Sequence, residues 1–128
     1  MFLLTASNFV IGQISNDSLQ SKKSKEKVFE TAPEPKGGMV GFMKFISSNL
    51  KYPKDARKQE KQGQVLVEFV VSNDGTVKSE SVRIVEGVFE SIDKEALRVI
   101  RLSPKWTPGT RNGQPIDMRM VMPIFFRL

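Results

Sequence analysis

The first candidates for chemistry in this 128-residue chain are its carboxylates, and the sequence contains no histidine and no cysteine. Their absence excludes an imidazole base, a thiolate nucleophile, a Ser-His-Asp triad and a disulfide framework. The notable acids are Asp74, Asp93 and Glu95. Asp74 stands in a turn sequence, and the other two stand near the start of a predicted helix, where acids are favourable. We therefore expect no catalytic residue, no metal site, no cofactor and no small-molecule substrate.

The composition is that of a folded, basic protein. Hydrophobic residues make up 39% of the chain and charged residues 27%, which is typical of one soluble globular domain. The net charge of +6 suits anionic partners such as nucleic acid, lipid headgroups or acidic protein surfaces. A solvated basic surface without any such partner explains the same charge.

Residues 1–12 form an apolar, uncharged segment that resembles a signal peptide. The segment is shorter than the ~20 residues that a membrane-spanning helix needs. Val10 and Gly12 are small enough for the recognition positions of signal peptidase, with cleavage before Gln13. No basic residue precedes the apolar run, which leaves open a start further upstream, and a frayed apolar tail is the alternative.

Residues 13–35 are polar and include four closely spaced lysines, which are Lys22, Lys23, Lys25 and Lys27. With few apolar side chains to bury, such a stretch cannot offset the entropy lost on ordering. We therefore predict a flexible polar linker, followed by a folded domain over residues 36–128.

The domain begins with a helical pattern. Apolar residues recur at helical spacing in one stripe, at Met39, Phe42, Met43, Ile46 and Leu50. Tyr52 precedes Pro53, and the residue before a proline is pushed out of the helical region, so the first helix ends there. A second short helix is predicted from Lys54 to about Gln62, ending at Gly63.

The next segments predict a β-hairpin. Residues 64–72 alternate with period two and are largely apolar on both faces, which is typical of a central strand. Asn73-Asp74-Gly75 supplies the positive-φ residues of a tight turn. The returning strand runs from Thr76 to Gly87 and changes phase, which predicts a bulge near residues 79–81.

A further helix and an aromatic anchor follow the hairpin. Ser91 is predicted as the N-cap, and the buried stripe comprises Ile92, Ala96, Val99, Ile100 and Ser103. Pro104 ends this helix. Trp106 then lies on irregular backbone, where we expect it to close the end of the core.

The last strand is predicted over residues 116–128, after an Asn112-Gly113 turn. Pro123 lies inside it, and because proline cannot donate to a ladder, the strand belongs at an edge or a bulge. Connections through a crossing helix are right-handed, so the helices pack on one face. The predicted fold is α+β, with one three-stranded antiparallel sheet in the order 2-1-3.

These segments occur in the order and spacing of a known family. The motifs that carry the resemblance are Tyr52-Pro53-Lys54-Asp55-Ala56 before Gly63-Gln64-Val65, Val70 to Gly75, Asp93 to Arg98, Pro104 to Gly109, and Met122 to Leu128. Each is common by itself, but the ordered set over residues 33–128 resembles the C-terminal domain of TonB energy transducers.

The resemblance implies a periplasmic module that binds the TonB box, a short segment of outer-membrane receptors, as a strand added to its last strand. The backbone of Arg119 and Val121 would make the pairing. The implied partner-binding residues are Lys51, Tyr52, Pro53, Met118, Arg119, Met120, Val121 and Met122. A structural role for Tyr52, with its ring packed on the core, is compatible with this one.

Two features of the family are not found in this sequence, namely an N-terminal transmembrane helix that meets the ExbB–ExbD motor and a long proline-rich spacer. ExbB–ExbD is therefore an implied partner only if a membrane anchor exists. The alternative is a free periplasmic peptide- or protein-binding module with no energy-transducing role. Nucleic-acid binding is disfavoured, because the exposed Ser, Lys and Glu positions of the second strand offer no stacking platform.

Overall fold

The computed structural model describes residues 28–128 of the chain. The predicted signal-like segment 1–12 and most of the predicted linker 13–35 lie outside the described residues. Within residues 28–128, none of the helices has the length and apolar character required to cross a membrane.

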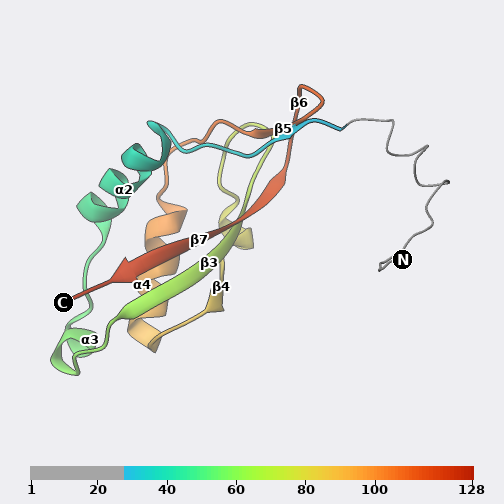
Figure 1. Cartoon of the computed structure of the whole chain (residues 1–128). Helices are drawn as coiled ribbons and strands as arrows, with labels where there is room; N and C mark the ends of the chain where they lie inside the picture. The colour runs from blue at the N-terminus through green and yellow to red at the C-terminus, as the bar shows by residue number, and fades with distance from the viewer. Residues whose placement is uncertain (1–27) are drawn as a thin grey trace, which may run out of the picture.

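The main sheet contains β4 (Arg83–Glu86), β3 (Gly63–Val71) and β7 (Met118–Phe126), in the order β4-β3-β7 with antiparallel pairing (Figure 1). The central strand β3 pairs with β7 over nine residues without interruption, from Gly63 opposite Phe126 to Val71 opposite Met118. A strand with partners on both sides and apolar residues on both faces lies in the interior, as the composition of β3 requires.

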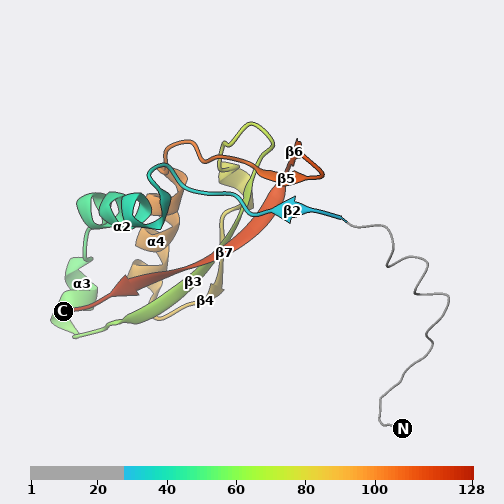
Figure 2. The same ribbon diagram turned by 45° about the horizontal axis from the view of Figure 1, so that its top comes forward.

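Three helices complete the described fold: α2 (Gly38–Asn49), α3 (Lys54–Lys58) and α4 (Glu90–Arg101). Helix α4 crosses one face of the main sheet (Figures 1 and 2). Its buried side chains meet those of β3 in a single core, which includes Val65, Val67, Phe69, Val71, Ile92, Ala96, Val99 and Ile100.

Trp106 closes one end of this core, as predicted. The residue is only 4% exposed, and its ring contacts Phe42 and Phe69 edge-on at centroid distances of 5.5 Å each. The indole N–H donates to the Ser103 hydroxyl at 2.8 Å, which satisfies the polar atom of a buried aromatic side chain. Trp106 thus holds α2 and β3 together.

The prediction of a single sheet is wrong. A second three-stranded sheet contains β2 (Glu30–Thr31), β5 (Gly109–Arg111) and β6 (Gln114–Ile116), in the order β2-β5-β6. Asn112 and Gly113 have φ of 51° and 83°, and two positive φ angles in a row make the tight turn that pairs β5 with β6. Strand β2 lies within the range predicted as linker and pairs with β5.

The predicted long returning strand with a bulge is also wrong. A 3₁₀ turn, η1 (Ser79–Ser81), interrupts the hairpin, and β4 begins only at Arg83. The Ser81 hydroxyl accepts the N–H of Val70 at 2.8 Å, in the place of a ladder carbonyl. Serine side chains compete in this way with backbone pairing, and the chain can leave the strand without an unpaired N–H.

Ser91 is not the N-cap of α4. The cap residue is Phe89, and the Asp93 carboxylate accepts the N–H of Val88 at 2.9 Å. The Ser91 hydroxyl instead donates to the Asp55 carboxylate of α3 at 2.7 Å. An acid in the first turn can reach back to the preceding backbone, and here it replaces the hydroxyl cap.

The free edge of strand β7

The orientation of the backbone in β3 shows which groups of β7 are free. The carbonyl of Val70 accepts from Lys78 at 3.0 Å, and the N–H of Ser72 donates to Thr76 at 2.8 Å. The even-numbered residues of β3 therefore point their backbone groups toward β4. Because these directions alternate along a strand, the odd-numbered residues of β3 bond to β7.

The same alternation divides β7 into two sets. The even-numbered residues, such as Met120 opposite Phe69, exchange hydrogen bonds with β3. The odd-numbered residues Arg119, Val121 and Phe125 direct their N–H and C=O groups away from the sheet. Among residues 28–128, no strand pairs with this side of β7. We call this row of unpaired N–H and C=O groups the free edge of β7.

Pro123 belongs to the outward set, since it lies opposite Leu66, an even-numbered residue. Its missing N–H therefore removes no bond between β7 and β3. Proline in a strand is tolerated at an edge with its nitrogen toward solvent, which is the position found here. Pro123 also limits how far along the edge another strand can pair.

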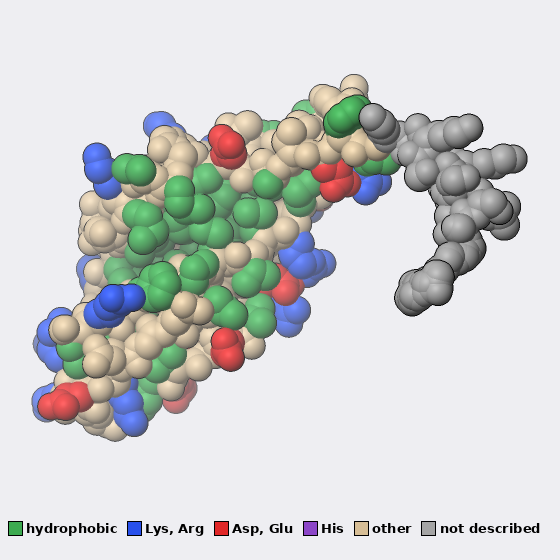
Figure 3. All heavy atoms as spheres, in the orientation of Figure 1, with side chains coloured by type: hydrophobic (Ala, Val, Ile, Leu, Met, Phe, Trp, Pro, Cys, Tyr) green, Lys and Arg blue, Asp and Glu red, His purple; other side chains and the backbone are tan. Residues whose placement is uncertain are grey.

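Helix α2 lies beyond the free edge of β7 in each ribbon view (Figures 1 and 2). Its predicted apolar stripe is divided, because Phe42 and Ile46 are buried whereas Met39 and Met43 are half exposed. Val40 is 69% exposed. Figure 3 shows hydrophobic side chains in a band that extends from α2 to β7. The backbone edge is thus flanked by apolar surface.

The predicted site residues at the Tyr-Pro motif lie near the Phe126 end of β7. The Tyr52 ring meets Phe126 edge-on at 5.7 Å, and its hydroxyl donates to the carbonyl of Lys61. The N–H of Lys51 donates to Glu95 at 2.7 Å. The Tyr52 ring therefore has the structural role of packing against the core. Pro53 directly precedes the first turn of α3.

Glu95 anchors this motif to α4. Burial acts to raise the pKa of Glu95, but hydrogen bonds from Arg98 and from the N–H of Lys51 outweigh burial and hold the pKa below its usual value. Arg98 also donates to the carbonyl of Asn49 at 2.8 Å, at the end of α2. One ion pair therefore fixes the segment between α2 and α3.

Arg119 lies at the other end of β7, near its first residue, and pairs with Glu68 on the face of the sheet opposite α4. Arg83 pairs with the same carboxylate at 3.1 Å. Hydrogen bonds from Arg83 and Arg119 lower the pKa of Glu68, whose side chain is almost inaccessible. The structure therefore separates Arg119 from the Tyr-Pro motif by most of the length of β7.

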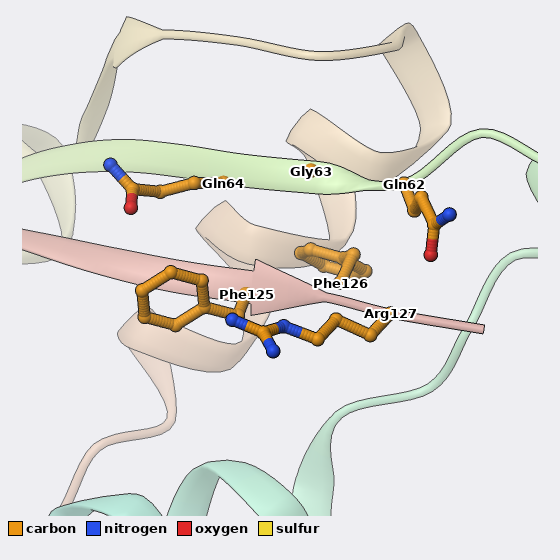
Figure 4. Close-up of a pocket in the computed structure, with 6 residues that line it drawn as sticks. All are labelled: Gln62, Gly63, Gln64, Phe125, Phe126 and Arg127. Carbon is orange, nitrogen blue, oxygen red and sulfur yellow. The ribbon is translucent and has the colours of Figure 1, made fainter.

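A hollow that sequence reasoning missed lies at the Phe126 end of the main sheet. Its volume is about 360 Å³, and it is lined by Gln62, Gly63, Gln64, Phe125, Phe126 and Arg127 (Figure 4). Phe125 and Arg127 share one face of the chain because their numbers differ by two. That spacing is the signal in the sequence, but only pairing with β3 brings Gln64 beside them.

The three notable carboxylates have structural partners. The Ser72 hydroxyl and the backbone N–H of Thr76 donate to Asp74 and lower its pKa to about 2. Asp93 caps α4 and Glu95 holds Lys51. Over the described part of the chain, no cluster of three or more acidic, His or Cys side chains could hold a metal ion.

The comparison with protein families is consistent with this geometry. The model for the Gram-negative bacterial TonB protein C-terminal region matches residues 48–128. The chain belongs to the TonB C-terminal family. Membership implies a TonB-type role in interaction with outer-membrane receptors, and the domains of this family are interaction modules without catalysis.

Two solved structures resemble this TonB-type domain. Both are solution NMR structures of the Helicobacter pylori TonB C-terminal domain. One is 27% identical with a TM-score of 0.52, and the match covers 67% of this chain and 76% of that chain. The other is 26% identical with a TM-score of 0.51, covering 69% and 90% respectively. No curated protein matches the chain.

Proposed function

We propose that the free edge of β7 receives the TonB box of an outer-membrane receptor as an added antiparallel or parallel strand, in the periplasm. The observation that supports this proposal is the row of outward backbone groups at Arg119, Val121 and Phe125, which have no partner among residues 28–128. An unpaired strand edge accepts an extended peptide through main-chain hydrogen bonds, and neighbouring pockets select its side chains.

Strand addition suits a protein that transmits force. Arg119 and Val121 each offer one donor and one acceptor, Pro123 offers an acceptor, and Phe125 again offers both. Each hydrogen bond contributes about 0.5–1.5 kcal/mol net. When the added receptor strand is pulled along its own direction, these hydrogen bonds are loaded together. The pairing with β7 therefore resists force better than its modest affinity indicates.

We further propose that this contact couples inner-membrane energy to nutrient uptake, with ExbB–ExbD as the partner where a membrane anchor is present. Family membership supports this role. A free periplasmic module would use the same edge to bind receptor segments without transmitting energy. The two roles differ in a receptor-dependent uptake assay, where only a coupling protein restores uptake to cells that lack their own transducer.

The strand-addition proposal is tested by amide hydrogen exchange in the presence of peptides that carry TonB-box segments. We expect micromolar binding, with new protection at the amides of Arg119, Val121 and Phe125. The amides of Met120 and Met122 already bond to β3 and should change little. Strand β4 provides the internal control, because its amides should be unaffected.

Two results would contradict this mode of binding. Protection confined to β4 or to the turn at Asp74 would place the peptide on the wrong edge. Equal new protection at odd and even residues of β7 would indicate rearrangement of the sheet and not addition to it.

A further inference from the structure

The hollow beside Phe125 contains hydrogen-bond donors and a positive charge, and no acid lines it. Arg127 lies with its Cζ 5.1 Å from the centroid of the Phe125 ring. None of the ion pairs formed within residues 28–128 includes Arg127. Its guanidinium is therefore held in place by the ring, with its charge available to a ligand.

Two glutamines add polar groups to the hollow. Gln64 lies directly opposite Phe125 in the ladder, so both side chains project from the same face. The carbonyl oxygen of Gln62 accepts the N–H of Leu128 at 3.0 Å, which leaves its amide hydrogens free within the described structure. Figure 4 shows Arg127 extended along β7 toward the Phe125 ring, with Gln64 across the two strands.

From this geometry we propose that Arg127, with Phe125 and Gln64, binds a carboxylate side chain of the receptor segment added to β7. The proposal rests on the strand-addition function above. A carboxylate is an acceptor-only group, and a guanidinium flanked by amide donors is its natural partner. An added strand would place a side chain of its own opposite Phe125, about 4.5–5.5 Å away between Cβ atoms, and Arg127 would lie at the diagonal spacing of about 7–8 Å, which long side chains can span.

The two ends of β7, on the face opposite α4, differ in a way that would fix the register of the added receptor strand. Arg119, near the first residue of β7, already pairs with the buried Glu68. Between the two arginines, the face of β7 opposite α4 carries Val121, Pro123 and Phe125. These residues suit apolar side chains of a guest strand. The guest that fits is an extended segment with apolar residues at alternate positions and one acidic residue at the Arg127 end.

The test is a selection of random twelve-residue peptides displayed against the full chain. For the unmodified protein we expect alternating apolar positions and an acidic residue enriched at one fixed position. For the Arg127→Gln variant the apolar pattern should persist and the acidic preference should disappear. Lys94→Gln is the matched control, because it removes the same charge from a largely exposed lysine on α4, behind the sheet.

A selected peptide is then compared with its Glu→Gln or Asp→Asn counterpart by calorimetry. The acidic peptide should bind the unmodified chain and Lys94→Gln about fivefold more tightly than its amide counterpart, a ratio typical of a partly exposed ion pair. Against Arg127→Gln the two peptides should bind equally. Arg127 is exposed, so the variant is expected to fold, and its NMR spectrum verifies this.

The outcomes separate the two proposals. If peptides protect the odd amides of β7 without an acidic preference, or keep that preference against Arg127→Gln, the carboxylate site is wrong and strand addition stands. If no selected peptide protects β7, strand addition itself is wrong, and the carboxylate site goes with it.

Discussion

The two outer strands of the main sheet, β4 and β7, differ in length, charge and continuity. Strand β4 has four residues, its register with β3 shifts between Leu66 and Val67, and η1 interrupts the chain just before it. Strand β7 pairs with β3 over nine residues without a shift. Short, irregular and charged edges discourage pairing with other chains, whereas long continuous ones invite it.

The difference assigns separate roles to the two edges. Arg83 and Glu86 place charges at both ends of β4, so its outer side is poorly suited to an apolar guest. The side chains between Arg119 and Arg127 on the face of β7 opposite α4 are apolar. Along the backbone edge, only Pro123 restricts pairing with another strand. The sheet thus has one edge that discourages strand addition and one that permits it, and the permissive edge is the one on the side of α2 (Figure 1).

The largest expected effect is on the stability of β3, the central strand that pairs with both β4 and β7. Trp106→Ala removes a buried ring that contacts Phe69 of β3 and Phe42 of α2. We expect a loss of about 3–5 kcal/mol in the free energy of unfolding. Urea denaturation measures it, and hydrogen exchange should accelerate at both edges together. A loss confined to one edge would show that the two edges fold independently.

The next effect distinguishes the two sides of β7 itself. Met120→Pro removes an N–H that bonds to Phe69, and an unpaired buried carbonyl costs about 1–3 kcal/mol. Val121→Pro removes an outward N–H and should leave stability nearly unchanged while peptide binding weakens about tenfold. Thermal unfolding and calorimetry measure the two quantities. Equal stability losses in the two variants would contradict the assigned backbone directions.

A smaller effect concerns the Tyr-Pro motif near the end of β7. Tyr52→Phe removes the hydroxyl that donates to Lys61 but keeps the ring on Phe126. The free energy of unfolding should fall by about 0.5–1.5 kcal/mol, with peptide affinity unchanged. A matching loss of affinity would show that the hydroxyl contacts the guest directly.

The smallest effect is at the β3–β4 turn and depends on pH. The pKa of Asp74 is lowered from its ordinary value of 3.8 to about 2. Its ionised form therefore stabilises the folded state fully at pH values above about 4. This contribution should decline as the pH falls from about 4 toward 2, and Asp74→Ala should lack it. Melting temperatures across this range check the sign, and peptide binding at β7 should be unaffected in the variant at neutral pH.

Patterns local in the chain were sufficient for much of the fold. The apolar alternation of β3, the stop at Pro104 and the burial of Trp106 follow from residue types at short spacing. Sequence reasoning failed where a side chain replaced a backbone partner. The Ser81 hydroxyl broke the returning strand, and Asp93 took the capping role predicted for Ser91. Propensity cannot rank such competing acceptors, because their geometry is set by distant packing.

The sequence by itself determined that the chain contains no histidine and no cysteine, and that a strand with Pro123 belongs at an edge or a bulge. Both conclusions follow from covalent chemistry, which no fold alters. Only the tertiary structure decided which backbone groups of β7 point outward, that α2 lies beyond them, and that Gln64 joins Phe125 and Arg127. These facts depend on register between segments far apart in the chain, and a shift of one residue would reverse every side chain.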